Sequence, residues 1–243
     1  MNRYLNQNPA HVQFLDMARL EVGFRTEFFA MDIAEIDAVP GTAATRAKQA
    51  IHEGISRLER LSGDTSKTND AKNEAAKALF QNVKKEVARS IESIKGYSDR
   101  EAEAAKNRAF AVLAPDATKG TIYTEVRQYC REQAAKGDPD FPAKLSQMVR
   151  ENIDVARAIS AGPGFLSGVG DERKLRLMTD ALEVFAPDDM AHMQHAVAVG
   201  KEADRMQAGL GKLEQAMFTS ALADRASYSR VDVNAPLIPA AAE

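Results

Sequence analysis

The sequence predicts an all-α protein, a multi-helix bundle of about eight helices. Apolar residues recur at helical spacing along most of the chain, and residues that start or end helices stand at the segment boundaries. Near the C-terminus, a further apolar set spaced alternately by three and four residues predicts one long heptad-patterned helix. This set consists of Ala196, Val199, Ala203, Met206, Leu210, Leu213 and Met217.

The first part of the chain predicts two helices. Asn8-Pro9 suits a helix start, because asparagine caps the free N–H groups and proline is tolerated in the first turn. The apolar pattern continues toward Ile36, and Val39-Pro40-Gly41 predicts a break. A second amphipathic helix follows Thr42, and we expect it to end at Gly63 in the left-handed conformation.

Three more helices are expected before residue 138. A long apolar pattern after Asn69 ends at Lys95-Gly96, which suits a helix C-cap. Directly afterwards, Ser98-Asp99-Arg100-Glu101 matches a capping box, in which the serine and glutamate side chains satisfy free backbone N–H groups. It predicts a new helix to about Leu113. The next helix ends at Gly137.

After residue 138, the helical pattern of apolar residues is interrupted once, by a glycine-rich segment. A helix follows residues 138–142 and carries apolar residues up to Ile159. Residues 160–171 contain four glycines and one proline, so we expect a hinge or domain boundary there. A short helix with Leu175, Met178, Leu182 and Phe185 comes next, and the heptad-patterned helix begins at Pro187.

These elements predict three parts. Residues 1–160 form an N-terminal helical bundle, residues 161–225 a C-terminal helical hairpin, and residues 226–243 an extended C-terminal arm. In the arm the helical pattern fails, and its prolines exclude a helix. Its apolar side chains are the expected partner-binding residues: Val231, Val233, Leu237 and Ile238.

Composition excludes several functional classes. With 32 basic and 35 acidic side chains, the net charge of -3 provides no overall field toward nucleic acid or an anionic membrane. The single cysteine, Cys130, excludes an intrachain disulfide and a four-thiolate zinc site. The N-terminus does not resemble a signal peptide, and no apolar run approaches the roughly 20 residues that span a bilayer. We expect a protein made in the cytoplasm.

The strongest metal-binding candidate lies at the start of the long helix. Asp188, His192 and His195 stand at i, i+4 and i+7 and share one helix face. No Glu-x-x-His pair and no second acidic cluster accompanies them. Asp188 also suits a helix start, and His192 continues the heptad seam. We therefore expect capping and packing here, with no catalytic residue and no cofactor.

Two other segments share some features with known binding motifs. The glycine-rich loop 162–171 lacks both the Lys-Ser or Lys-Thr pair and the preceding strand of a phosphate loop. Its Phe165 and Leu166 favour a shaped interhelix loop with apolar anchors. A basic stripe on the third helix is interleaved with acidic residues and offers only Phe80 for stacking, which is typical of a solvated face. The stripe consists of Lys67, Lys72, Lys77, Lys84, Lys85, Arg89 and Lys95.

One stretch carries a family resemblance. Residues 158–171 read AISAGPGFLSGVGD, and a short helix, Ala186-Pro187-Asp188 and a long helix follow. In this arrangement the chain resembles small Ala-rich helical proteins of tailed bacteriophages, over about residues 155–225. The shared feature is a style of loop and helix without a catalytic signature. The resemblance implies a virion or assembly component without enzymatic activity.

The leading functional hypothesis is a non-enzymatic structural or interaction protein, a bacteriophage virion or assembly component that docks through its long helices and C-terminal arm. Its partners would be other subunits of a large assembly or further copies of the chain. The alternatives are a metal-binding protein or metal-dependent enzyme that uses Asp188, His192 and His195, and a nucleic-acid-binding regulatory module. Co-sedimentation with particles, metal content and salt-dependent DNA binding separate these three.

Overall fold

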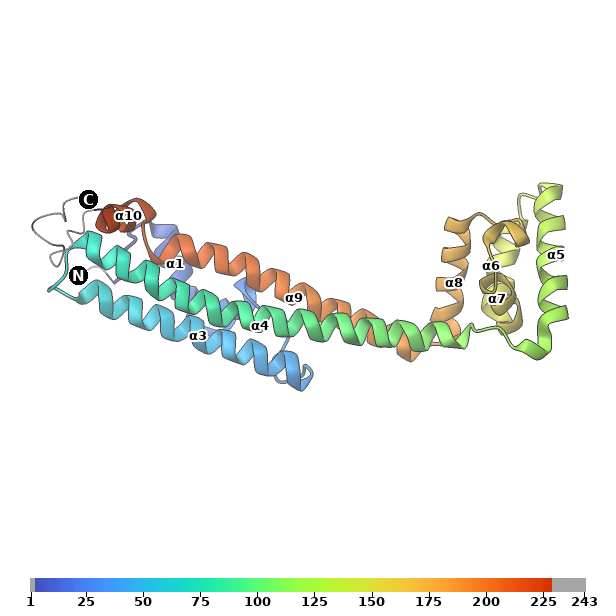
Figure 1. Cartoon of the computed structure of the whole chain (residues 1–243), viewed down its shortest axis with the longest axis horizontal. Helices are drawn as coiled ribbons and strands as arrows, with labels where there is room; N and C mark the ends of the chain where they lie inside the picture. Colours follow the sequence, from blue (N-terminus) through green and yellow to red (C-terminus); the bar gives the residue numbers. More distant parts are fainter. Residues whose placement is uncertain (1–2, 229–243) are drawn as a thin grey trace, which may run out of the picture. The chain divides into compact units, whose positions relative to one another are not determined.

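The computed structural model describes residues 3–228, and all secondary structure in this part is helical (Figure 1). This confirms the predicted all-α fold class. Ten α-helices and two short 3-10 helices are present within the described residues. They are α1 (Pro9–Ala18), α2 (Glu21–Glu27), α3 (Ala38–Gly63), α4 (Asn69–Val112), η1 (Ala117–Lys119), α5 (Gly120–Lys136), α6 (Phe141–Glu151), α7 (Ile153–Ser160), η2 (Gly164–Ser167), α8 (Asp171–Phe185), α9 (Pro187–Met217) and α10 (Ser220–Tyr228).

The chain forms two compact units. Unit 1 comprises residues 1–97 and 199–243, of which 3–97 and 199–228 are described, and unit 2 comprises residues 98–198. Helices α4 and α9 contribute residues to both units. This grouping differs from the predicted division at residue 160, because segments far apart in sequence share one core. No helix among residues 3–228 combines the length and apolar character needed to cross a membrane.

Unit 1 is built around an apolar core to which α1, α2, α3, α4, α9 and α10 contribute. Phe24, Phe28 and Phe29 supply much of its volume and are all 0% exposed. Helices α3 and α4 approach closely at Gly54, where an added Cβ would lie 2.5 Å from Val83 Cγ2. A glycine at this position therefore sets the distance between the two helices.

The N-terminal helix starts where the sequence predicts but is shorter. The Asn8 side chain accepts a hydrogen bond from Ala10 N at 3.0 Å, with proline in the first turn. The helix ends at Ala18, so the predicted continuation to Ile36 is wrong. An added Cβ on Gly23 would lie 1.8 Å from Met17 O. Helix α2 therefore folds back on the end of α1 at a distance that only glycine permits.

The predicted break at Val39-Pro40-Gly41 is also wrong. These residues form the first turn of α3, where backbone N–H groups have no helical partner and proline costs no hydrogen bond. Gly63 belongs to the last turn of the same helix. Within the described residues, the left-handed glycines are Gly137 and Gly168.

Helix α4 runs without interruption through Gly96, so the predicted C-cap and the capping box after it are wrong. The Ser98 hydroxyl donates to Ala196 O at 2.8 Å and is buried. The side chain that would cap a new helix is used instead for contact between α4 and α9. The ion pair between Lys95 and Asp204, 2.8 Å long, joins the same two helices in unit 1. Tertiary contacts explain why the local capping pattern is not realised.

Unit 2 has its own core, formed by α5 to α8 with parts of α4 and α9. Gly137 ends α5 with φ 71°, as the sequence predicts. The expected single helix after residue 142 is two helices, because the Asn152 side chain accepts from Asp154 N at 2.9 Å and caps α7.

The heptad-patterned residues of α9 are all between 0% and 2% exposed. The helix starts at Pro187, as predicted, and ends at Met217. Its apolar seam is covered by this chain's own side chains, and coiled-coil geometry stays a prediction. Residues 226–228 of the predicted arm belong to α10, and the rest of the arm lies outside the described residues.

His52 makes the stability of unit 1 depend on pH. Burial, and then the charge of Lys48, lower the pKa of His52. Its Nε2 is buried and has no hydrogen-bond partner among residues 3–228, and the ring contacts Phe24 edge to face with centroids 6.3 Å apart. Because the unfolded chain binds the proton more readily, stability is full above the ordinary histidine pKa of about 6.5 and falls as the pH drops below it.

We expect a His52→Leu variant to lose this part of the pH dependence. Urea unfolding of both proteins between pH 5 and pH 8 measures it. An equal slope in the wild type and the variant would assign the pH dependence to other groups.

Candidate functional site

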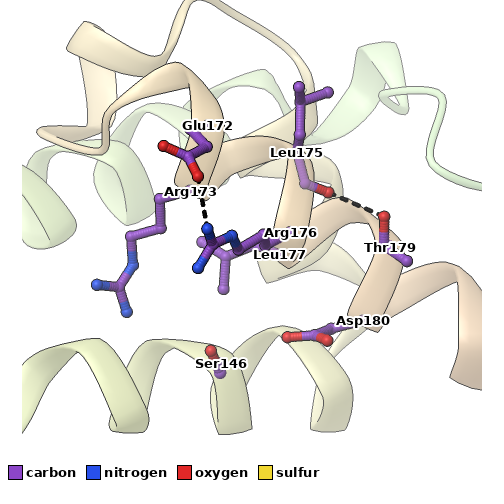
Figure 2. A pocket seen from close by; sticks show the side chains of 8 residues that line it. All are labelled: Ser146, Glu172, Arg173, Leu175, Arg176, Leu177, Thr179 and Asp180. Carbon is purple, nitrogen blue, oxygen red and sulfur yellow. Dashed lines mark hydrogen bonds and ion pairs between the residues drawn. The ribbon is translucent and has the colours of Figure 1, made fainter.

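A surface groove of unit 2 lies between α6 and α8 and has a volume of about 650 Å³. Figure 2 shows Arg173 and Arg176 extending from α8 into the space above the helix that carries Ser146. Helix α8 turns Leu177, Ala181 and Leu182 toward the core, so its polar residues face this groove and the solvent. The lining residues are Ser146, Glu172, Arg173, Leu175, Arg176, Leu177, Thr179 and Asp180.

Charges in this groove balance. Arg176 pairs with Glu172 through an i,i+4 contact, whereas Arg173 makes no hydrogen bond or ion pair within the described residues. Two guanidinium groups therefore face two carboxylates, those of Glu172 and Asp180. Such a groove has no net field for a polyanion and suits a polar protein surface that offers both donors and acceptors.

The sequence did not indicate this groove. The apolar pattern of the short predicted helix includes Leu175, but this side chain is 62% exposed. The buried face of α8 is rotated toward Leu177 and Ala181 because α6 and α7 both pack on that side. The Glu172 and Arg176 spacing was the one sequence signal for a solvent-facing side.

The glycine-rich loop presents an exposed aromatic ring on rigid backbone. Phe165 is 74% exposed, the largest value among the exposed large apolar side chains of the described part. The Ser167 hydroxyl donates to Gly164 O at 3.0 Å, and Val169 N donates to the same oxygen at 3.0 Å. Asp171 Oδ1 accepts from Gly164 N at 3.3 Å.

Close packing explains why this loop needs glycine. An added Cβ on Gly164 would lie 2.3 Å from Val169 O. Gly168 has φ 72° and would place a Cβ 3.0 Å from Arg131 Cα of α5. Helices α7 and α8, on either side of the loop, belong to one core, so the loop connects elements within unit 2.

Of the metal-binding candidates, His192 contacts two charged side chains of α4. Its Nδ1 lies 3.0 Å from Arg108 Nη2, and its Nε2 lies 3.3 Å from Glu101 Oε2. A guanidinium only donates, so Nδ1 accepts, and the proton of the neutral ring is on Nε2, the nitrogen beside Glu101. Arg108 Nε also donates to Asp189 Oδ1 at 2.7 Å. Both ring nitrogens of His192 therefore serve the contact between α4 and α9.

The other two candidates, Asp188 and His195, are exposed on α9. In residues 3–228, no group of three histidine, cysteine, aspartate or glutamate side chains is placed to hold a metal ion. The shared helix face seen in the sequence is thus real, but its central histidine is already hydrogen-bonded.

The basic stripe is largely paired within the chain. Lys72 Nζ donates to Ser62 O at 2.9 Å, and Lys77 pairs with Asp224 at 2.8 Å. Lys95 pairs with Asp204, and Arg89 pairs with Glu86. Four of the seven basic residues therefore have partners inside the protein, which reduces the charge available to a nucleic acid.

Cys130 is buried in the core of unit 2 at 0% exposure. Burial raises the pKa of its thiol to about 11. At pH 8 only about a thousandth of the thiol would be thiolate, the reactive form. We expect very slow labelling by a thiol reagent in the native protein and fast labelling in denaturant. Fast labelling of the native protein would contradict the burial of this residue.

The predicted partner-binding residues Val231, Val233, Leu237 and Ile238 lie outside the described residues. Comparison with protein-family models, with curated proteins and with solved structures finds no match. The class of protein that the fold defines is therefore an all-helical chain of two compact units with an exposed aromatic loop and a charge-balanced groove.

Proposed function

We propose that this chain is a non-enzymatic interaction protein, and specifically a bacteriophage virion or assembly component that docks onto other protein subunits. One observation carries this proposal. Of the eleven exposed large apolar side chains among the described residues, seven lie on unit 2: Phe110, Ile122, Tyr129, Phe165, Leu175, Val184 and Val197. Unit 2 spans residues 98–198, so fewer than half of the described residues hold most of the exposed apolar groups.

Burial of such side chains against a partner is favourable, at roughly 25 cal/mol per Å² of apolar surface. The balanced charges of the groove between α6 and α8 add specificity without attracting polyanions. The apolar seam of α9 is used in the chain's own core and is not available to a partner. The proposal therefore places docking on the surface of unit 2 and on the C-terminal arm. The long helices, which the sequence suggested as docking elements, are not part of it.

Purified particles produced together with the tagged chain test this proposal. We expect mass spectrometry to find the chain at a fixed ratio to the other subunits. Leu175→Asp should lower its incorporation, while Val22→Asp, a matched change at a 68% exposed residue of unit 1, should not. Particles that lack the wild-type chain would overturn the proposal.

The arm is tested separately, by truncation after Tyr228. Isolated extended segments gain too little from burial to offset their backbone ordering, so the arm should add little to the stability of the free chain. We expect unchanged helicity by circular dichroism and weaker incorporation into particles. Loss of helicity would place the arm in the protein's own core, and unchanged incorporation would remove its docking role.

A further inference from the structure

The loop that carries Phe165 presents this ring on a backbone that is already ordered. Gly164 O accepts hydrogen bonds from Ser167 Oγ and Val169 N, and Gly164 N donates to Asp171 Oδ1. The ring is 74% exposed, so its burial against a partner removes apolar surface from water. Because the loop needs little further ordering, little of this gain is lost as conformational entropy.

Three cationic side chains surround the same loop. Lys174 Nζ donates to Gly162 O. Arg127 Nη1 lies 3.9 Å from the position that a Cβ on Gly162 would take, and Arg131 Cα lies 3.0 Å from the corresponding position on Gly168. The two arginines are one helical turn apart, so both belong to the side of α5 on which η2 packs.

The charges of these arginines are not neutralised among residues 3–228. Arg131 makes no hydrogen bond or ion pair there, and Arg127 makes only a 3.5 Å contact to the uncharged Thr124 Oγ1. In the same part of the chain, Asp171 is the one carboxylate that bonds to the loop, and its Oδ1 accepts from Gly164 N. Guanidinium donors beside the exposed ring are therefore available to carboxylates of a partner.

The arrangement favours an acidic protein segment over other anionic partners. Nucleic acids and anionic membranes are attracted over a long range by positive net charge, and the whole chain has a net charge of -3. Single-stranded nucleic acid stacks on a series of aromatic side chains, and membrane anchoring needs more apolar surface than one ring provides. Local cations around a single ring suit short-range ion pairs beside an apolar contact.

We propose that Phe165 and the two arginines of α5 bind an acidic segment of a partner protein that also offers an apolar pocket. The ring fills the pocket, and Arg127 and Arg131 pair with carboxylates at its edge. Arginine can bind a carboxylate through two parallel hydrogen bonds, which fixes the orientation of the partner as well as its charge. This inference rests on the proposed docking function and adds to it the site and the chemistry of the partner.

Photo-crosslinking inside purified particles tests the site and the partner chemistry together. Phe165 is replaced by p-benzoylphenylalanine, which keeps an aromatic side chain and couples to neighbouring C–H bonds on irradiation. We expect mass spectrometry to find cross-links to one segment of another subunit, in which aspartate and glutamate outnumber lysine and arginine. The same analogue at Val22, 68% exposed on unit 1, is the matched control and should not reach that segment.

Two substitutions test the energetics of the same surface. Arg131→Glu should weaken incorporation into particles by at least about tenfold, because it places like charges opposite each other. Phe165→Ser should weaken it by a similar factor through loss of the anchor. Arg100→Glu is the matched control, since Arg100 is an exposed arginine of α4 without a hydrogen bond or ion pair within the described residues. It should be incorporated like the wild type, and circular dichroism checks that all three variants keep their helicity.

Failure of this inference and failure of the docking function give different results. Particles without the wild-type chain would overturn both. If the wild-type chain is present, cross-links from position 165 to a segment without an acidic excess, to a second copy of the chain or to nothing would overturn this inference alone. Wild-type incorporation of Arg131→Glu would do the same. Binding of the free chain to a thymidine oligonucleotide or to phosphatidylglycerol vesicles, lost in both Phe165→Ser and Arg131→Glu, would assign the surface to nucleic acid or membrane instead.

Discussion

Leu210→Ala and Leu213→Ala should each lower the free energy of unfolding by about 2 to 5 kcal/mol. Both leucines lie on the buried seam of α9, at 2% and 0% exposure, and belong to the core of unit 1. Removing their side chains loses apolar contacts and leaves a cavity that the surrounding helices fill only in part. Urea unfolding followed by circular dichroism measures the loss.

Leu175→Ala is the control for this pair, because it makes the same chemical change at a 62% exposed position. We expect it to change stability by less than about 0.5 kcal/mol, the usual range for surface positions. Losses of the same small size at Leu210 and Leu213 would place the seam in solvent and refute the packing that defines the core of unit 1.

Gly209→Ala and Gly211→Ala should act in opposite directions, although the residues are only two positions apart on α9. An added Cβ on Gly209 would lie 2.5 Å from Glu27 O and 2.6 Å from Phe28 Cδ1. The Phe28 ring is 0% exposed and stacks on Phe24 with centroids 5.6 Å apart, so it has little room to move. We expect a loss of about 1 to 3 kcal/mol, the range for overpacked cores.

An added Cβ on Gly211 would meet nothing within 4 Å. Alanine should therefore stabilise the helix there by roughly 0.5 to 1 kcal/mol, since glycine costs that much in a helix interior. Thermal or urea unfolding of the two variants side by side is the measurement. Equal effects would show that the close contact between α9 and Phe28 does not exist in solution.

The candidate interaction surface was only partly foreseeable. Phe165 stands in a glycine-rich loop, and the sequence marked it as an apolar anchor between helices. Its exposure of 74% depends on how the loop is held against α5 and Asp171, which no local pattern describes. Arg173 and Arg176 looked like ordinary charges on an amphipathic helix. They line a groove because α6 lies opposite, and that neighbour is fixed only by the packing of unit 2.

The metal-binding candidates were likewise predictable only in part from the sequence. Helical spacing alone was enough to place Asp188, His192 and His195 on one face of a helix that starts at Pro187. The contacts of His192 were not predictable from spacing, because Arg108 and Glu101, the two residues beside its ring nitrogens, lie more than 80 residues away in sequence.

The sequence by itself determined the all-helical class, the start of α1 at the Asn8 cap, the end of α5 at Gly137, and the buried seam of α9. These features depend on periodicity and on hydrogen bonds between neighbouring residues. Only the tertiary structure decided that α4 continues through Ser98, because that hydroxyl bonds to Ala196 O of α9, and that α2 folds back at Gly23. Local sequence patterns limit the conformations that each segment can adopt. Contacts between distant segments select among these conformations, because the stabilisation from many such contacts exceeds that from a single helix cap.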